Sequence, residues 1–239
     1  MAKKAIIIGA SSGIGKELAK VMSQNNYIVG LVARRIQLLD ELVKELPGDS
    51  FIKHIDVSKP DEAMNQLNDL ISEMDGVDII VISSGIGFIN HDLNWAQEKE
   101  TIDVNVSGFI AMANIAMHHF LYRGSGHLIG VSSIAAIRGD DTAPAYSASK
   151  AFISNYMAGL RKKVSKAGLP IIITDVQPGF VDTAMAKGDS LFWVASPQKA
   201  AHQIFMAIVK KRKHVYVTKR WKLIAWLMKT MPEFIYNYL

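Results

Sequence analysis

Tyr146 and Lys150 have the residue types and the spacing that acid–base chemistry needs. Four residues apart on a helix, their side chains lie on one face, one turn from each other. An ammonium group beside a phenol favours the phenolate, so this spacing predicts that Lys150 lowers the pKa of Tyr146 from its ordinary value of ~10. Tyr146 is therefore a candidate general acid and base. The alternative is an exposed surface pair, since such spacings are common on helices.

A serine hydroxyl could meet the same substrate atom. Ser133 follows the apolar run His127–Val131, which reads as a buried strand. A hydroxyl at the end of that strand could bond the oxygen that exchanges a proton with Tyr146. Ser132 is the neighbouring alternative for this role.

A glycine-rich turn near the start of the chain has the form of a phosphate cradle. The apolar strand pattern Lys4–Ile8 leads into Gly9, then Ser11, Ser12, Gly13, Ile14 and Gly15, and a helical pattern begins at Lys16. Gly9 permits a tight turn, Gly13 lets the backbone approach a pyrophosphate, and Gly15 allows close packing of helix on strand. The segment predicts a dinucleotide site, although the same glycines could form a simple turn.

These features together resemble the short-chain dehydrogenase/reductase family, in its compact single-domain branch. The resemblance covers about residues 3–200. It rests on Gly9, Gly13, Gly15, Asp56-Val57, Asn105, Ser133, Tyr146, Lys150 and Pro178-Gly179, in the family's order and spacing. That spacing favours Ser133 over Ser132.

The resemblance implies a role for each matched residue. Tyr146 would exchange the proton with the substrate oxygen and Ser133 would hydrogen-bond that oxygen. Lys150 would hold the nicotinamide ribose, placing both Tyr146 and Lys150 at the cofactor as well, and Asn105 would hold a water that links Lys150 to solvent. The remaining cofactor contacts would be Asp56 and Val57 at the adenine, Gly85 by close backbone approach, and Pro178, Gly179, the Val181 backbone and the Thr183 hydroxyl at the nicotinamide. Taken alone, Asp56 could cap a helix, Asn105 could be an ordinary helical residue, and Pro178-Gly179 could be only a turn.

The sequence predicts one α/β unit with a doubly wound, Rossmann-type parallel sheet of about seven strands and helices on both faces. We expect residues 1–200 to form the cofactor-binding and catalytic core, and residues 201–239 to add a last helix and strand and a basic, Trp-rich tail of the same domain. The expected strands are Lys4–Ile8, Ile28–Ala33, Ser50–His54, Val77–Ile82, Gly126–Val131, Ile171–Val176 and His214–Thr218. The chain has no cysteine, which excludes disulfides and thiolate metal sites and fits a cytoplasmic protein. No metal site is expected.

The residues at the end of the second expected strand indicate which of the two dinucleotides, NAD or NADP, the protein binds. An acidic residue there would bond the 2′-hydroxyl of NAD, but the chain has Arg34 and Arg35. Arg34, with Arg35 as a second candidate, could bind a 2′-phosphate, and Ser11 and Ser12 could add hydroxyl donors. We therefore expect NADP(H), although two arginines could also simply open a solvated helix.

One segment departs from the family pattern. Where the family has Asn-Asn-Ala-Gly after the fourth strand, this chain has Ile82-Ser83-Ser84-Gly85. Gly85 still permits close approach to the cofactor. The two amide side chains that tie neighbouring strands are replaced, which puts the local hydrogen bonding in doubt.

The C-terminal tail is basic and apolar. From Leu191 onward there are nine Lys or Arg and one acid, a net charge of +8, whereas residues 1–190 carry eighteen basic and twenty-one acidic side chains, a net charge of −3. Basic residues around a Trp- and Leu-rich helix are typical of a helix at a membrane surface, and Lys229 and Pro232 interrupt the apolar stretch too early for a bilayer span. The alternative is a helix that packs on the domain or on a partner subunit. Nucleic acid is not expected, since no recognition module accompanies the charge.

The sequence therefore predicts an NADP(H)-dependent oxidoreductase that interconverts a ketone and a secondary alcohol, as a homodimer or homotetramer, with peripheral membrane contact as a further hypothesis. Apolar residues predict an apolar or lipid-like substrate. They would form a lid (Met185, Leu191, Phe192, Trp193 and Val194, within Ala184–Ala195) and an opposite wall (Ile86, Phe88, Ile134 and Ile137). The lid residues could instead pack on the core. The alternative functions are a non-catalytic dinucleotide sensor and a membrane-surface interaction protein.

Overall fold

The computed structural model describes residues 2–183 and 192–236. Seven parallel strands form one sheet in the order β3-β2-β1-β4-β5-β6-β7. The strands are β1 (Lys4–Ile8), β2 (Ile28–Ala33), β3 (Ser50–His54), β4 (Ile79–Ile82), β5 (Gly126–Val131), β6 (Ile171–Pro178) and β7 (His214–Val217). The order reverses direction between β1 and β4, which confirms the predicted doubly wound, Rossmann-type sheet.

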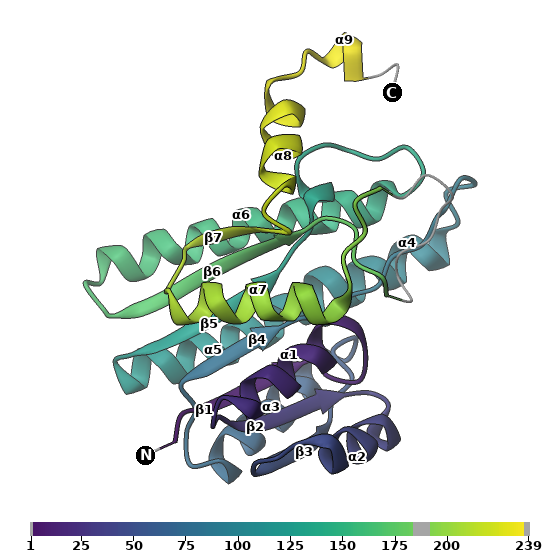
Figure 1. Cartoon of the computed structure of the whole chain (residues 1–239). Coiled ribbons are helices and arrows are strands. Elements are labelled where there is room, and N and C mark those ends of the chain that lie inside the picture. The colour runs from purple at the N-terminus through teal and green to yellow at the C-terminus, as the bar shows by residue number, and fades with distance from the viewer. Residues whose placement is uncertain (1, 184–191, 237–239) are drawn as a thin grey trace.

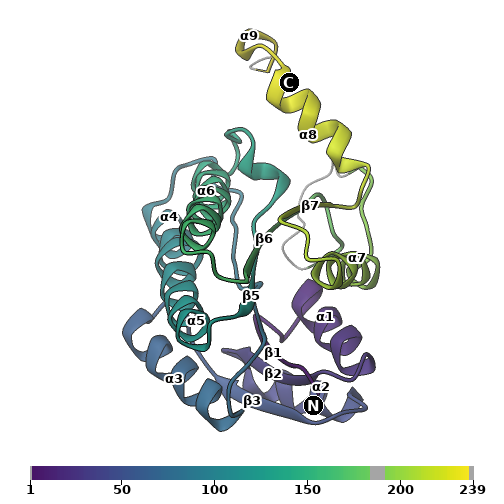
Figure 2. The same ribbon diagram turned by 90° about the vertical axis from the view of Figure 1, so that its left-hand side faces the viewer.

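Helices cover both faces of this sheet (Figure 1; Figure 2). One face carries α1 (Gly13–Gln24), α2 (Ile36–Glu45) and α7 (Pro197–Val209). The other carries α3 (Pro60–Glu73), α4 (Trp95–Ile102), α5 (Phe109–Arg123) and α6 (Pro144–Lys166). A π-helix, η1 (Asp103–Gly108), joins α4 to α5, and a short 3-10 helix, η2 (Ile134–Ala136), follows β5. The C-terminal helices α8 (Trp221–Thr230) and α9 (Glu233–Tyr236) project from the body of the molecule.

Two apolar cores lie on the two faces of the sheet. Successive residues of a strand point to opposite faces, so Ile6 and Ile8 pack toward α3 and α5, whereas Ala5 and Ile7 pack toward α1 and α7. All four side chains are fully or almost fully buried. A smaller third cluster joins Ile134 to α8 through Trp221 and Ala225.

The strand bounds agree with the predicted ones except at three ends. β6 extends two residues further, to Pro178, and β7 ends one residue earlier, at Val217. β4 begins at Ile79 because side chains of α5 bind the backbone of Val77: its N–H donates to Nε2 of His119 (3.2 Å) and its carbonyl accepts from Nη1 of Arg123 (2.9 Å). No helix in residues 2–183 and 192–236 is long and apolar enough to cross a membrane.

Candidate active site

The predicted site residues follow the carboxyl ends of neighbouring parallel strands. The Gly9 turn follows β1, Gly85 follows β4, Ser133 follows β5 and Gly179 follows β6. Parallel strands bring these ends to one edge of the sheet, and in sheets of this kind ligands bind where the strand order reverses, here between β1 and β4. The topology thus places segments that are far apart in the sequence around one site.

Lys150 is buried at this edge, below Tyr146. Both belong to the first turns of α6, and the Lys150 side chain has only 4% of its surface exposed. Its Nζ atom donates to the carbonyl of Val131 at the end of β5 (3.2 Å) and lies 5.6 Å from the centroid of the Tyr146 ring. The ring itself packs on the Gly87 backbone, since a Cβ atom at Gly87 would come within 2.7 Å of it. The two side chains are therefore neighbours in a fixed arrangement rather than a solvated surface pair.

The prediction that Lys150 lowers the pKa of Tyr146 is wrong in this structure. Burial raises the pKa of the Tyr146 phenol, and the nearby Ser133 hydroxyl lowers it only in part. Burial also lowers the pKa of Lys150 to about 8, against a smaller opposing effect of Asp175. Desolvation disfavours the charged form of both groups, and it is the largest cause of each shift.

Ser133 and Ser132 have different surroundings. The Ser132 hydroxyl donates to Oδ1 of Asp175 (2.5 Å) and to the carbonyl of Val176, away from Tyr146. The Ser133 oxygen accepts from the N–H of Ala135 at the start of η2 (3.1 Å), and its hydroxyl affects the Tyr146 pKa. Ser133 is therefore the serine that lies beside Tyr146, as the spacing predicted.

Asn105 lies in the π-helix η1 and is completely buried. Its side chain accepts from the N–H of Ile86 (2.9 Å) and donates to the carbonyl of Ile86 (2.8 Å) and to the Ser149 hydroxyl (3.0 Å). It thus ties η1 to the loop after β4 and to α6, one residue before Lys150. A Cβ atom at Gly85 would lie 3.1 Å from Nζ of Lys150 and 3.3 Å from Oδ1 of Asn105. The backbone at Gly85 therefore packs closely against both side chains.

The glycine-rich turn leaves the N-terminus of α1 open. Ser12 is the N-cap residue, but its side chain makes no capping hydrogen bond and the first turn contains no acid. The first backbone N–H groups of a helix have no partner within the helix and favour an anion. Gly9 (φ +95°) and Gly13 (φ +56°) adopt conformations that other residues rarely take, and a Cβ at Gly9 would come within 2.7 Å of the Ser84 nitrogen. These features fit the pyrophosphate of a dinucleotide.

Arg34 and Arg35 are both exposed after β2 but point to different partners. Nη2 of Arg35 donates to the hydroxyl oxygens of Ser11 (3.1 Å) and Ser12 (3.3 Å) in the glycine-rich turn. Arg34 lies toward Asp56, whose carboxyl Oδ1 accepts from the Ser58 N–H and hydroxyl. Burial alone would raise the pKa of Asp56, but these hydrogen bonds and the Arg34 charge lower it. A basic group thus lies on each side of the end of β2.

Asp56 and Val57 lie between β3 and α3. Asp56 bonds Ser58 in a local turn, while the N-cap of α3 is Lys59, so Asp56 does not cap that helix. Val57 is buried, and Gly108 of η1 packs directly on it, since a Cβ at Gly108 would overlap the Val57 carbonyl.

The segment that departs from the family pattern is tied by its backbone. The N–H of Ser83 donates to the carbonyl of Ile8 (2.8 Å), which joins the ends of β4 and β1 without an amide side chain. The Ser84 hydroxyl is buried and has no hydrogen-bond partner within the described residues. Buried hydroxyls are normally paired, so this one fits a site that a polar ligand completes.

The Pro178–Thr183 segment closes the other side of the site. A Cβ at Gly13 would lie 3.0 Å from the methyl group of Thr183, so this segment meets the glycine-rich turn. Val181 is buried and pairs with Ala195 in a parallel β-bridge. Of the expected lid, Phe192, Trp193 and Val194 are 48, 42 and 44% exposed, and Phe192 stacks on Trp221 with ring centroids 5.2 Å apart. Met185 and Leu191 lie outside the described residues.

Asp175, which was not among the predicted site residues, is a buried carboxylate that acts on the charge of Lys150. Asp175 of β6 is fully buried and accepts hydrogen bonds from the hydroxyls of Ser132 (2.5 Å) and Ser154 (2.6 Å). Nε2 of Gln177 donates to Ser154, and His214 lies 3.9 Å from the carboxylate. The signal was present, since an acid inside the apolar run Ile171–Val176 must be buried on a central strand.

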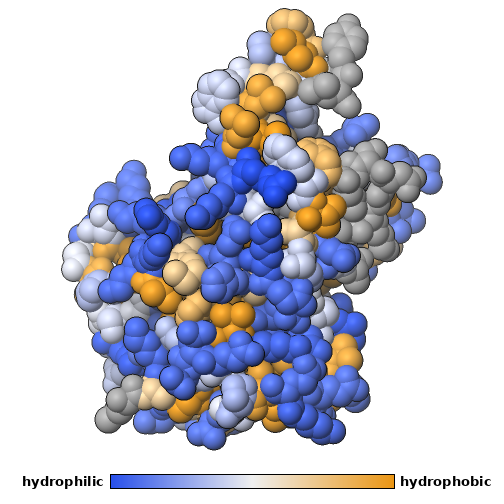
Figure 3. Space-filling view, viewed as in Figure 1, coloured by the Kyte–Doolittle hydropathy of each residue, from blue (hydrophilic) through white to orange (hydrophobic). Residues whose placement is uncertain are grey.

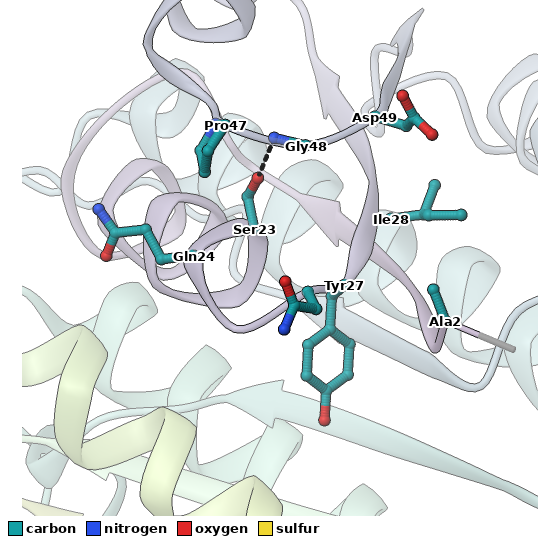
Figure 4. A pocket seen from close by; sticks show the side chains of 9 residues that line it. Ala2, Ser23, Gln24, Tyr27, Ile28, Pro47, Gly48 and Asp49 are labelled. Carbon is teal, nitrogen blue, oxygen red and sulfur yellow. Dashed lines mark hydrogen bonds between the residues drawn. The ribbon is translucent and has the colours of Figure 1, made fainter.

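A hollow at the opposite edge of the sheet is separate from this site (Figure 4). It is lined by residues at the amino ends of β1, β2 and β3, including Ala2, Ile28 and Asp49. Asp49 is the carboxylic acid among its lining residues. In its wall the Gly48 N–H donates to the Ser23 hydroxyl oxygen (3.3 Å). In parallel α/β sheets ligands bind at the carboxyl ends of the strands, so this hollow is not part of the candidate site.

The fold and the site define a dinucleotide-binding α/β protein. Residues 3–191 match the family model described as short chain dehydrogenase. An uncharacterised oxidoreductase from Myxococcus xanthus is 34% identical over 188 residues, which cover 77% of this chain and 74% of that protein. The chain therefore belongs to the short-chain dehydrogenase/reductase family of oxidoreductases, which use NAD or NADP.

Solved structures have the same fold. A short-chain dehydrogenase/reductase from Burkholderia phymatum in complex with NAD superposes with a TM-score of 0.84 at 18% identity, covering 95% of this chain and 92% of that one. ElxO with NADP bound has a TM-score of 0.81 at 18% identity, covering 91% and 97%. Because one of these proteins holds NAD and the other NADP, the likeness does not decide between the two cofactors.

Proposed function

We propose that this protein is an NADP(H)-dependent oxidoreductase that interconverts a ketone and a secondary alcohol on an apolar substrate. The observation that carries the proposal is the meeting of Ser133, Tyr146 and Lys150 at the carboxyl ends of β4 and β5, with Asn105 bonded to the adjoining loop and helix. A protein that only senses a dinucleotide has no need for this set.

The side chains divide the chemistry among them. Tyr146 is protonated at neutral pH, because burial raises its pKa, and it gives its proton to the substrate oxygen during ketone reduction. Ser133 donates a hydrogen bond to that oxygen as negative charge develops there. Lys150 holds the cofactor ribose beside Tyr146, and Asn105 holds the Ile86 backbone and α6 in register around it. The bound nicotinamide supplies or accepts the hydride.

The proton donor is tested by Tyr146→Phe. The ring is kept, so packing changes little, but the transferable proton is lost. We expect turnover to fall by roughly two to four orders of magnitude while cofactor affinity persists. The control is Tyr122→Phe, since Tyr122 is 96% exposed and lies on α5. Near-native turnover in Tyr146→Phe would refute the mechanism.

NADP(H) is proposed because β2 ends in Arg34 and Arg35, without an acid, and Arg35 already bonds the glycine-rich turn. These guanidinium groups bind the 2′-phosphate. We expect NADPH to bind much more tightly than NADH in direct titrations. Replacing both arginines by alanine should remove most of the difference, about 1.5–3 kcal/mol for each charge-assisted hydrogen bond that is removed. Arg212→Ala, at an exposed arginine after α7, is the control. Equal affinity for the two cofactors in the native protein would contradict the proposal.

An apolar substrate is proposed from the cluster that Ile134, the residue after Ser133, forms with aromatic side chains. Ile134 packs in one cluster with Trp221 and Phe180, and Phe192 contacts both rings while remaining half exposed. Such a wall favours a long-chain or polycyclic ketone over a small polar one. Comparing kcat/KM for the two classes tests this, and higher efficiency on polar ketones would refute it. A homodimer or homotetramer stays a prediction for sedimentation analysis.

A further inference from the structure

The helix α8 has two apolar faces, and only one of them is covered. Trp221 and Ala225 are buried against Ile134 and its neighbours. On the opposite face Leu223, Trp226 and Leu227 are 63, 62 and 45% exposed. Figure 3 shows hydrophobic side chains gathered over this projecting end of the molecule. A contiguous apolar surface of this kind marks an interaction site.

The short helix α9 also exposes apolar side chains, and both helices are held in place. Phe234 and Ile235 of α9 are 68 and 41% exposed. Arg138 donates to the carbonyls of Met228 in α8 and of Met231 just after it, and the Tyr236 hydroxyl donates to the carbonyl of Gly139 (2.7 Å). The apolar side chains are therefore presented outward by an anchored structure.

Exposed cations border this surface. Lys219 and Arg220 precede α8, and Lys222 and Lys229 lie along one flank of its apolar face. Within the part of the chain that the structure describes, none of these four forms an ion pair with a carboxylate, and Glu233 is the one acid in the sequence after residue 190. A helix with an apolar outer face and lysines beside it combines apolar burial with attraction to negative charge.

We propose that α8 and α9 dock this protein on the surface of a membrane that contains anionic lipid. Leu223, Trp226, Leu227, Phe234 and Ile235 enter the acyl boundary, and the cations face the lipid phosphates. A second copy of the chain is a poorer occupant, because joining two such surfaces brings like charges together. These four cations outnumber Glu233, the one acid of the two helices, and this excess of positive charge orients this end toward the lipid.

Docking in this way brings the aromatic wall of the proposed substrate site to the membrane. Trp221 at the base of α8 contacts Phe180, Phe192 and Trp193, with ring centroids 5.3, 5.2 and 6.4 Å apart, and Arg220 lies over the Trp193 ring. The half-exposed aromatic side chains beside the site thus adjoin the docking surface. This consequence for substrate entry rests on the proposed function, whereas the docking itself does not.

The test is co-sedimentation of the full chain with vesicles of phosphatidylcholine, with and without phosphatidylglycerol. We expect binding to the anionic vesicles that weakens with added salt, and little binding to phosphatidylcholine alone. Leu223→Ser with Trp226→Ser should lower the partition coefficient by roughly tenfold or more. The matched control is Leu93→Ser with Trp95→Ser, the same residue types at similar exposure (64 and 74%) before and at the start of α4.

Charge is tested separately. Lys222→Gln with Lys229→Gln should weaken binding roughly tenfold to anionic vesicles, and Lys162→Gln with Lys166→Gln on α6 should not. Equal binding of the Leu223/Trp226 variant and its control would overturn the proposal. So would an absence of vesicle binding together with an oligomer that the Leu223/Trp226 variant dissociates in sedimentation velocity, since the face would then cover a second copy. Neither readout uses turnover, so failure here leaves the proposed reaction to its own tests.

Discussion

Replacing Lys150 by methionine should make the protein more stable while removing its activity. The buried ammonium has one hydrogen bond, to Val131, and burial lowers its pKa from 10.5 to about 8. That fall corresponds to about 3 kcal/mol of unfolding free energy at neutral pH. Methionine keeps the shape, loses the Val131 bond and leaves Asp175 without a nearby cation, so we expect a net gain of about 1–3 kcal/mol. For a chain of this length the melting temperature would rise by about 2–10 °C.

The pH dependence of this gain gives the sharper test. Below about pH 8 Lys150 is protonated in both states, and the folded state bears the full cost of the buried charge. Between about 8 and 10.5 the unfolded chain binds the proton that the folded protein has released, so wild-type stability rises with pH. The gap between the variant and the wild type should therefore shrink from about pH 7 to about pH 10 in urea denaturation. Lys163→Met, at an exposed lysine of α6, is the control. A less stable Lys150→Met at neutral pH, or a gap that does not change with pH, would refute the reasoning.

Three further substitutions test other parts of the site. Asp175→Ala should lower the unfolding free energy by about 3–5 kcal/mol, because the buried Ser132 hydroxyl and the half-buried Ser154 hydroxyl lose their carboxylate acceptor, and Asp175→Asn should cost clearly less in the same urea titrations; equal effects would contradict this account. Asn105→Ala should cost about 2–4 kcal/mol and weaken turnover as well, since the loop after β4 loses its anchor; unchanged melting and turnover would count against it. Gly9→Ala should cost about 1–3 kcal/mol and reduce dinucleotide affinity by calorimetry, whereas Gly139→Ala, with open space around it, should change neither.

The strands could be predicted from the sequence because most of them are short apolar runs bounded by turn residues. β1, β2, β3 and β5 have the predicted bounds. The start of β4 could not be placed, because it depends on His119 and Arg123, about forty residues away in the chain. Hydrogen bonds between residues so far apart in the chain do not change the local hydrophobic pattern from which strands are predicted.

The members of the candidate site were predictable by type and spacing, but their surroundings were not. The sequence around Asn105 is helical, and its widening into a π-helix accompanies the bonds to Ile86, which no local pattern encodes. The pKa of Tyr146 depends on how deeply its ring is buried, which the spacing of Tyr146 and Lys150 does not show. The sequence therefore predicted a lowered pKa where burial raises it. That Arg35 rather than Arg34 reaches Ser11 and Ser12 is a matter of side-chain direction after β2.

The packing of Trp221 on Gly179 links the candidate dinucleotide site to the C-terminal helices. A Cβ at Gly179 would overlap the Trp221 ring, so the first residue of α8 rests directly on the turn that follows β6. A ligand that moves the turn at Gly179 also moves α8. When binding at one site changes the affinity of a second site, binding at the second changes the affinity of the first by the same factor. Any factor by which a dinucleotide changes the affinity of the tail for its surface is therefore the factor by which that surface changes the affinity for the dinucleotide. With the docking proposed above, dinucleotide occupancy and membrane attachment would be coupled in this way without a separate regulatory domain.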